Sequence, residues 1–521
     1  TAQITYDQDG DWVVDASFSD PIGRNTSLHN EFTIDTIAPT LKLTFDNNDA
    51  ANGKYYKATR TATIVETERN FSAEQSPVTT TAKDDNGRSV DAPGDSGWRE
   101  TGHYEHTTTV AFTSENHFTL KGEATDLAGN KAVVVTEPEF VIDLTKPKLT
   151  IDNIDDKTAY AGTVSPAINY EDTNLDQTKA TYTITGARHG KLDKLEDLAK
   201  ITTTSEKTTD NTKDVSFTDF ERKVASDDVY TIKANVTDMA GNTFEAQKTF
   251  SVNRFGSTYT FTSETKDLRG TYLKESKPVT ITEINVSGLK PGSRKITVAK
   301  DDRATELKPS DYTISTGDDK GWSRTTYTVP ANNFYDDGYY RVQVQSTDNA
   351  GNLSENTMND KDADRKATAE VNFAVDRQTP QAAVVGITSG GVYYGGSKQV
   401  SVSAKDNLAL ESAQLVVDGQ SVGKWNGEEL VKGNPSYAVP ADANGHTIVV
   451  TTVDKAGNTA TTTYDNVIVA SNWWQYAMNT PAIRNALIFG TMLLLAAIAI
   501  IGVLVHRTRQ LSAYRRNPFE R

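Results

Sequence analysis

The sequence contains no cysteine, only four methionines in 521 residues, and only one long hydrophobic run. Without cysteine the chain has no disulfides, and small secreted animal domains commonly need them, so this absence argues against an animal extracellular protein. The mean hydropathy is -0.54, which means that most of the chain must be soluble. Each domain must therefore be large enough to be stable on its hydrophobic core alone.

An excess of positive charge is also lacking. The chain has 54 Lys and Arg against 70 Asp and Glu, a net charge of -16. An acidic surface repels phosphate backbones and anionic lipid, so we expect no nucleic acid partner.

The residues of common catalytic sites are scarce. There are seven scattered histidines and no nucleophile-elbow pattern, so we expect no enzyme activity from this chain. His103 and His106 suggest a zinc site at first sight. Residues three apart on a strand point to opposite faces, however, so ordinary strand residues are the favoured interpretation.

What the sequence does contain is a repeat with a spacing of 106 to 112 residues. The motif reads Asp-x-Ala-Gly-Asn, and a looser copy lies at residues 20–25. This spacing is too long for a solenoid unit and matches a sandwich domain of about 100 residues. The four full copies are Asp126–Asn130, Asp238–Asn242, Asp348–Asn352 and Asp454–Asn458.

The segments on both sides of the motif predict strands. Before each copy, apolar and polar residues alternate, as in Tyr230, Ile232, Ala234 and Val236, which indicates a half-buried strand. Asp, Gly and Asn favour a tight turn, so the motif predicts a hairpin. The return strands end in Phe-x-Ile/Val-Asp/Asn, and a proline soon follows three of them, at positions 39, 147 and 380.

This combination of alternating strand, Asp-x-Ala-Gly-Asn turn, Phe-ended return strand and proline resembles the bacterial immunoglobulin-like repeats of large Gram-positive surface proteins. The resemblance covers residues 1 to about 470 and implies an all-β fold of tandem immunoglobulin-like β-sandwiches with a role as adhesin or spacer. We expect the last part of a truncated domain at 1–36, whose missing strands would lie upstream. Complete domains are expected at 37–144, 145–253, 254–376 and 377–470.

Two insertions are expected within these domains. Residues 187–211 contain Leu192, Leu195 and Leu198 at helical spacing, which predicts one short helix. Residues 353–369 lengthen the hairpin that follows the third motif.

A single transmembrane helix is predicted at 486–505, the one long hydrophobic run. Its 20 residues would span about 30 Å, the thickness of a bilayer core. The juxtamembrane segment 471–485 contains Trp473 and Trp474, and the tail 506–521 is rich in arginine. The positive-inside rule then predicts a cytoplasmic tail and a surface-exposed N-terminal part. The lipid bilayer is thus an expected partner.

Two acidic stretches are weak candidates for calcium. Carboxylate and amide oxygens suit Ca²⁺, but neither stretch has a complete ligand spacing, and solvated turns are the alternative interpretation. No other cofactor is expected. The candidate residues are Asp46, Asp49, Asp152, Asp155 and Asp156.

The predicted function is a cell-surface stalk that projects an N-terminal region and meets a protein or glycan on a host or neighbouring cell. Two alternatives stay open at this point. The chain could be the stalk and anchor of a surface enzyme, a glycoside hydrolase or protease whose catalytic domain lies upstream. The sandwiches could also bind glycans themselves, for which the neighbouring Tyr393 and Tyr394 are the one hint.

Overall fold

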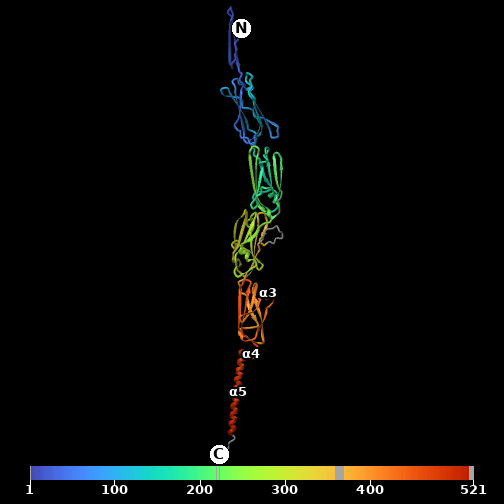
Figure 1. Ribbon diagram of the computed structural model, residues 1–521, viewed down its shortest axis with the longest axis vertical. Helices are drawn as coiled ribbons and strands as arrows, with labels where there is room; N and C mark the ends of the chain where they lie inside the picture. Colours follow the sequence, from blue (N-terminus) through green and yellow to red (C-terminus); the bar gives the residue numbers. More distant parts are fainter. Residues whose placement is uncertain (1, 219, 222, 358–368, 515–521) are drawn as a thin grey trace, which may run out of the picture.

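A computed structural model describes residues 2–218, 220–221, 223–357 and 369–514. In this part of the chain the fold is all-β, with tandem sandwiches followed by one long helix, as predicted. The sandwiches follow one another end to end, with the N-terminal hairpin at one extreme and the helix at the other (Figure 1).

The first element is a two-stranded antiparallel hairpin, β1 (Gly10–Ser19) and β2 (Asn25–Ile34). Tyr6 packs edge-on against Trp12 and Phe32 and forms a small aromatic cluster. The alternating residues predicted to face a core do not do so here, and Phe18 is 68% exposed. A hairpin has no second sheet to cover its apolar face.

Sandwich 1 has a four-stranded and a five-stranded sheet. In order across the sheets, the strands are β3 (Thr40–Phe45), β5 (Arg60–Thr67), β9 (Glu105–Phe112) and β8 (Arg99–Gly102), facing β4 (Tyr55–Tyr56), β11 (Val135–Ile142), β10 (Asn116–Gly122), β6 (Val78–Lys83) and β7 (Ser89–Val90).

Sandwich 2 repeats this order of strands. They are β12 (Lys148–Asp152), β14 (Ala167–Glu171), β18 (Thr212–Thr218) and β17 (Thr203–Thr208), facing β13 (Thr158–Tyr160), β20 (Thr243–Val252), β19 (Asp228–Thr237), β15 (Thr181–Gly186) and β16 (Gly190–Lys191).

Sandwich 3 adds β29 (Leu353–Glu355), which pairs with β28. Its other strands are β21 (Thr258–Phe261), β23 (Val279–Asn285), β27 (Trp322–Val329) and β26 (Thr313–Asp319), facing β22 (Tyr272–Leu273), β30 (Val371–Val375), β28 (Gly338–Thr347), β24 (Lys295–Lys300) and β25 (Arg303–Glu306).

Sandwich 4 has a three-stranded first sheet. Its strands are β31 (Gln381–Val385), β33 (Ser397–Lys405) and β36 (Ser436–Pro440), facing β32 (Val392–Tyr394), β38 (Thr459–Ala470), β37 (Asp442–Asp454), β34 (Leu410–Val417) and β35 (Gln420–Asn426).

The strand before each motif carries the core, as its alternation predicted. In β19, Tyr230, Ile232, Ala234 and Val236 are each no more than 1% exposed and belong to the core of sandwich 2. Residues between them, such as Lys233, point to solvent. Burying one face of each strand against the opposite sheet is the main stabilising contribution to each sandwich.

Short helices lie in the connections. The predicted helix is present as α1 (Leu195–Leu198). Leu192, which precedes it, and Leu198, its last residue, are both buried. Most of the predicted insertion at 353–369 lies outside the described residues. Helices that the sequence pattern did not indicate are α2 (Ser263–Leu268), α3 (Gly427–Lys432) and the 3₁₀ turns η1 (Ala73–Gln75), η2 (Val224–Ser226) and η3 (Ala331–Phe334).

The C-terminal helices are α4 (Trp473–Asn479) and α5 (Pro481–Tyr514). Helix α5 has proline at its first position, where a missing N–H costs nothing. It extends beyond the predicted 486–505 at both ends, since the flanking residues also favour helix. Residues 481–512 are long and apolar enough to cross a membrane, and none of their most apolar window is buried in the protein.

Candidate functional site

The Asp-x-Ala-Gly-Asn motif forms a closed turn. In sandwich 1 the backbone N–H of Asp126 donates to the carbonyl of Asn130, and the N–H of Asn130 donates to Asp126 Oδ1 at 2.8 Å. Gly129 has a φ of 96°, a conformation that side chains disfavour. The corresponding side-chain bond is also 2.8 Å long in the other three copies, so all four motifs have one geometry.

The motif asparagine also ties each sandwich to the segment before it. Its Nδ2 donates to the backbone carbonyl of the residue that directly follows the preceding strand and opens the linker. The four bonds are Asn130 to Asp35 (3.0 Å), Asn242 to Asp143 (3.0 Å), Asn352 to Asn253 (2.6 Å) and Asn458 to Asp376 (2.8 Å). We call these four places junctions 1 to 4.

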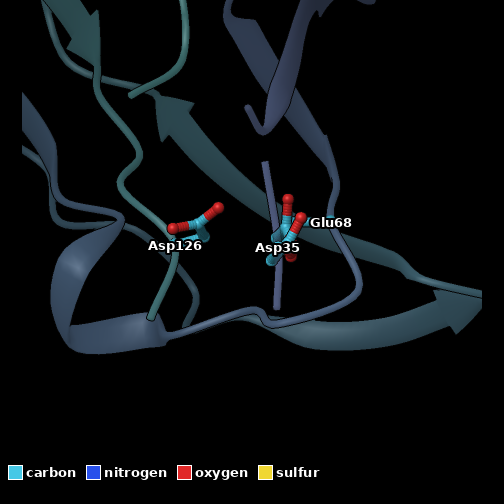
Figure 2. A group of neighbouring side chains, drawn as sticks. All are labelled: Asp35, Glu68 and Asp126. Carbon is cyan, nitrogen blue, oxygen red and sulfur yellow. The ribbon is translucent and has the colours of Figure 1, made fainter. Parts of the chain in front are cut away.

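At junctions 1, 2 and 4 three carboxylates converge. At junction 1, Asp35 follows β2, Glu68 follows β5 and Asp126 opens the motif turn, and Figure 2 shows their carboxylates gathered in one space. One oxygen from each lies within 4.8 Å of the others. The equivalent groups are Asp143, Asp172 and Asp238 at junction 2, and Asp376, Asp406 and Asp454 at junction 4.

Burial makes these groups electrostatically costly. Desolvation raises the pKa of Asp143 to about 7 and that of Asp172 to about 6. It also raises the pKa of Asp376 to about 6. Among the described residues, no Lys, Arg or His forms an ion pair with any of the nine carboxylates; Arg69, next to Glu68, instead pairs with Asp11. Buried carboxylates normally need a positive partner.

Junction 3 has amide side chains in place of two of the three carboxylates. Asn253 and Asn285 occupy the places held by Asp143 and Asp172 at junction 2, and only the motif aspartate, Asp348, remains. Asn253 Nδ2 donates to Asp348 Oδ2 at 2.7 Å and Asn285 Nδ2 donates to the same oxygen at 3.2 Å. The amide N–H groups thus lie where the other junctions have further carboxylate oxygens.

Junction 3 also has a direct side-chain interface between two sandwiches. Trp322 of sandwich 3 donates through Nε1 to Asp228 Oδ1 of sandwich 2 at 2.7 Å. The guanidinium of Arg188 lies 3.6 Å from the centre of the Trp322 ring and contacts Asp319 at 2.6 Å. Asp228 is fully buried and its second oxygen binds the ring of His189 at 2.7 Å.

The acids predicted from sequence as calcium ligands are not those that converge. All five are exposed, and none belongs to a group of three close carboxylates in the described chain. Although Asp46 and Asp49 follow junction 1 in sequence, β3 carries them to the far end of sandwich 1. There, Asn52 donates to the carbonyl of Met239 in the next motif, at 2.8 Å.

Asp152 is the last residue of β12, and Asp155 and Asp156 follow that strand. Asp152 accepts a hydrogen bond from Asn169 of β14, and Asp156 accepts one from the backbone N–H of Thr249 in β20, so both bond to other strands of sandwich 2.

The two histidines considered as zinc ligands contact different aromatic rings. His106 stacks on Phe71 with ring centres 3.8 Å apart, and His103 packs against Tyr104. Tyr393 packs on the core of sandwich 4, while Tyr394 contacts Tyr476 of α4. Tyr394 therefore forms part of the contact between sandwich 4 and the C-terminal helices.

Comparison with known proteins adds a family likeness for part of the chain. The family model of a bacterial Ig-like domain matches residues 80–143, which end at junction 2. With the repeated sandwich topology, this match supports immunoglobulin-like repeats of the bacterial type. No curated protein sequence matches the chain.

Several solved structures are similar to the chain. A tetra-tandem repeat from the extending region of a large adhesion protein is 16% identical, with a TM-score of 0.36, and covers 83% of this chain and 100% of its own. Fibronectin(III)-like modules of Clostridium thermocellum CbhA are 15% identical, with a TM-score of 0.20, and the match covers 41% of this chain and 95% of theirs. A structure of Dpr2 Ig1-Ig2 in complex with DIP-Theta Ig1-Ig3 is 9% identical, with a TM-score of 0.32, and the match covers 64% of this chain and 98% of the other. Similarities of this size say nothing about function.

Proposed function

We propose that the chain is a stiff stalk on the surface of a bacterial cell, anchored in the membrane by α5, with the sandwiches outside. The observation that supports this most is the junction itself. The same asparagine bond joins consecutive units at four places, so the linkers have little freedom to swing.

The length of the stalk follows from its units. Strands of about ten residues make each sandwich about 40 Å long, so four sandwiches in line reach about 160 Å. Such a stalk would hold its N-terminal region away from the envelope, where that region can meet a protein or glycan on another surface.

The anchor end supports the same proposal. Helix α5 has 34 residues and is about 50 Å long, more than the bilayer core of about 30 Å. Trp473 and Trp474 in α4 are 53% and 61% exposed, in the position of an interfacial aromatic belt. Arg507 and Arg509 follow the apolar stretch and favour a cytoplasmic C-terminus.

The orientation can be tested with single cysteines, because the natural chain has none. The full chain would be exported by a bacterial host, with cysteine placed at Ser471 or Ser512, exposed residues on either side of the apolar stretch. A membrane-impermeant maleimide added to intact cells should label Ser471→Cys and leave Ser512→Cys unlabelled until the cells are lysed. Labelling of Ser512→Cys on sealed cells would reject the topology.

The stiffness can be tested on the detergent-solubilised full chain by negative-stain electron microscopy. Straight particles of uniform length, close to 160 Å without the helix, are expected. Particles with broadly distributed bends at the junctions would reject a stiff stalk.

A further inference from the structure

We propose that junctions 1, 2 and 4 each bind one Ca²⁺ through their three converging carboxylates, and that junction 3 is built to do without one. This inference concerns the junctions themselves and does not depend on where the chain is displayed. It differs from the sequence-based calcium candidates in every residue.

The chemistry of the groups favours a hard cation. At each of the three junctions, oxygens of three carboxylates lie within 4.8 Å of one another, with no nitrogen or sulfur ligand in the group. Oxygen-only sites suit Ca²⁺, whereas zinc and copper favour imidazole and thiolate. At junction 2 all three carboxylates, Asp143, Asp172 and Asp238, are buried.

A buried oxygen without a partner points to the same ligand. Asp376 is fully buried, and its Oδ2 has no hydrogen-bond donor. Asp406 Oδ1, in the same group, is likewise unpartnered. Buried carboxylate oxygens are nearly always bonded, so two such atoms beside the carboxylate of Asp454 mark a place for a cation.

Junction 3 serves as the internal comparison. There, Asn253 and Asn285 each donate an amide proton to Asp348 Oδ2, so neutral amides bond the motif aspartate where the other junctions bring two further carboxylates. Both carboxylates are replaced by amides, and these amides bond the remaining carboxylate of Asp348. The contact of Trp322 with Asp228 then joins the two sandwiches directly.

The origin of the ligands gives the cation a mechanical effect. At junction 4, Asp376 follows β30 of sandwich 3, whereas Asp406 and Asp454 belong to sandwich 4. An ion bound to all three ties the two sandwiches together and removes the repulsion among the carboxylates. Calcium should therefore restrict junctions 1, 2 and 4 and leave junction 3 unchanged.

Equilibrium dialysis of the EDTA-treated full chain in detergent against radioactive calcium tests the count. Dissociation constants of about 10⁻⁴ to 10⁻³ M are typical of extracellular modules. We expect three ions per chain. The double variant Asp376→Asn/Asp406→Asn, which copies the amides of junction 3, should bind two. The reverse variant Asn253→Asp/Asn285→Asp should bind four.

The matched control is Asp46→Asn/Asp49→Asn, which removes two exposed acids with the same change of charge and should still bind three. Far-UV circular dichroism would establish that each variant is folded. No binding at calcium concentrations up to about 10 mM would overturn the proposal. So would a count of three in both the 376/406 and 253/285 variants, or a loss of ions in the control.

A second measurement reads single junctions. Spin labels on cysteines introduced at the exposed Lys295 and Lys424 would report across junction 4, and labels at Lys207 and Lys308 across junction 3. Of these two distance distributions, calcium should narrow the one across junction 4 and leave the one across junction 3 unchanged. Equal responses at both junctions, or none at junction 4, would overturn the assignment.

Discussion

The side-chain amide of Asn242 donates a 3.0 Å hydrogen bond to the backbone carbonyl of Asp143, 99 residues earlier in the chain. The same amide also bonds Asp238 Oδ2 at 2.9 Å, within its own motif. One side chain therefore stabilises a tight turn and holds the end of the preceding sandwich. Its three counterparts do the same at junctions 1, 3 and 4.

Replacement of Asn242 by alanine should weaken junction 2. The change leaves a carbonyl oxygen and a buried carboxylate each short of one donor, so a loss of about 1–3 kcal/mol in the stability of sandwich 2 is expected. Differential scanning calorimetry of the full chain would measure it. Asn211→Ala, at an exposed position of the same sandwich, is the control and should change little. Equal losses of stability from the two variants would mean that the hydrogen bonds of the Asn242 side chain contribute nothing.

The register of β19 can be tested by adding a charge to its inner face. Val236 is 1% exposed and lies in the core of sandwich 2, so Val236→Asp buries an unpaired carboxylate and should cost several kcal/mol. Lys233 lies on the outer face and pairs with Glu245, so Lys233→Gln should cost less than about 1 kcal/mol. Thermal unfolding of both variants decides the question. A similar loss from both would contradict the register.

The interface at junction 3 should hold sandwiches 2 and 3 together through Trp322. Trp322→Ala removes the bond to Asp228 and the cation–π contact with Arg188, worth about 0.5–2 kcal/mol. The spin-label distance distribution across junction 3 should broaden, while that across junction 4 should not change. Trp98→Phe, which alters a tryptophan bonded within sandwich 1, is the control. An unchanged distribution across junction 3 would show that the tryptophan is not needed there.

A pH dependence is expected from His189, beside the same interface. Both ring nitrogens face acceptors, Asp228 Oδ2 and the carbonyl of Ala225, each at 2.7 Å. The hydrogen bond from the ring to Asp228 raises the pKa of His189. Because the folded pKa is above the unfolded value of about 6.5, the stabilisation is complete below that pH. It is lost as the pH rises through the folded pKa.

NMR titration of the His189 ring should therefore give a pKa above about 6.5, and the melting temperature of sandwich 2 should fall as the pH rises through that value. His189→Gln should remove this part of the slope. The neighbouring charges are Asp228, Asp227 and Arg188, of which only Asp228 bonds the ring. An unaltered slope in His189→Gln would contradict the assignment.

The fold was predictable because its signal is local. The alternation from Tyr230 to Val236 predicts which face of one strand is buried, and the Asp, Gly and Asn of the motif predict a turn. The candidate site was harder to predict. Each of its carboxylates comes from a different segment, and an isolated acid such as Asp172 or Asp406 looks like any other acid at the end of a strand.

The proximity of acids to a linker in the sequence favoured Asp46 and Asp152 as ligands, but β3 and β12 carry these residues away from the junction that precedes them. One signal in the sequence could have indicated the residues that converge. The return strands are directly followed by Asp35, Asp143, Asn253 and Asp376. The one exchange of acid for amide, at Asn253, occurs at junction 3, where the described residues form no group of three close carboxylates.

By itself, then, the sequence determined the repeat, the all-β class, the buried face of the strand before each full motif and the apolar helix, since these depend on spacing along one segment. Only the tertiary structure decided which acids meet, and that Asn242 reaches Asp143. It also placed Trp322 against Asp228, 94 residues away. The physical reason is that a strand converts separation in sequence into distance along the sandwich. Groups far apart in the chain thus meet at one end, and neighbours in the chain are carried to opposite ends.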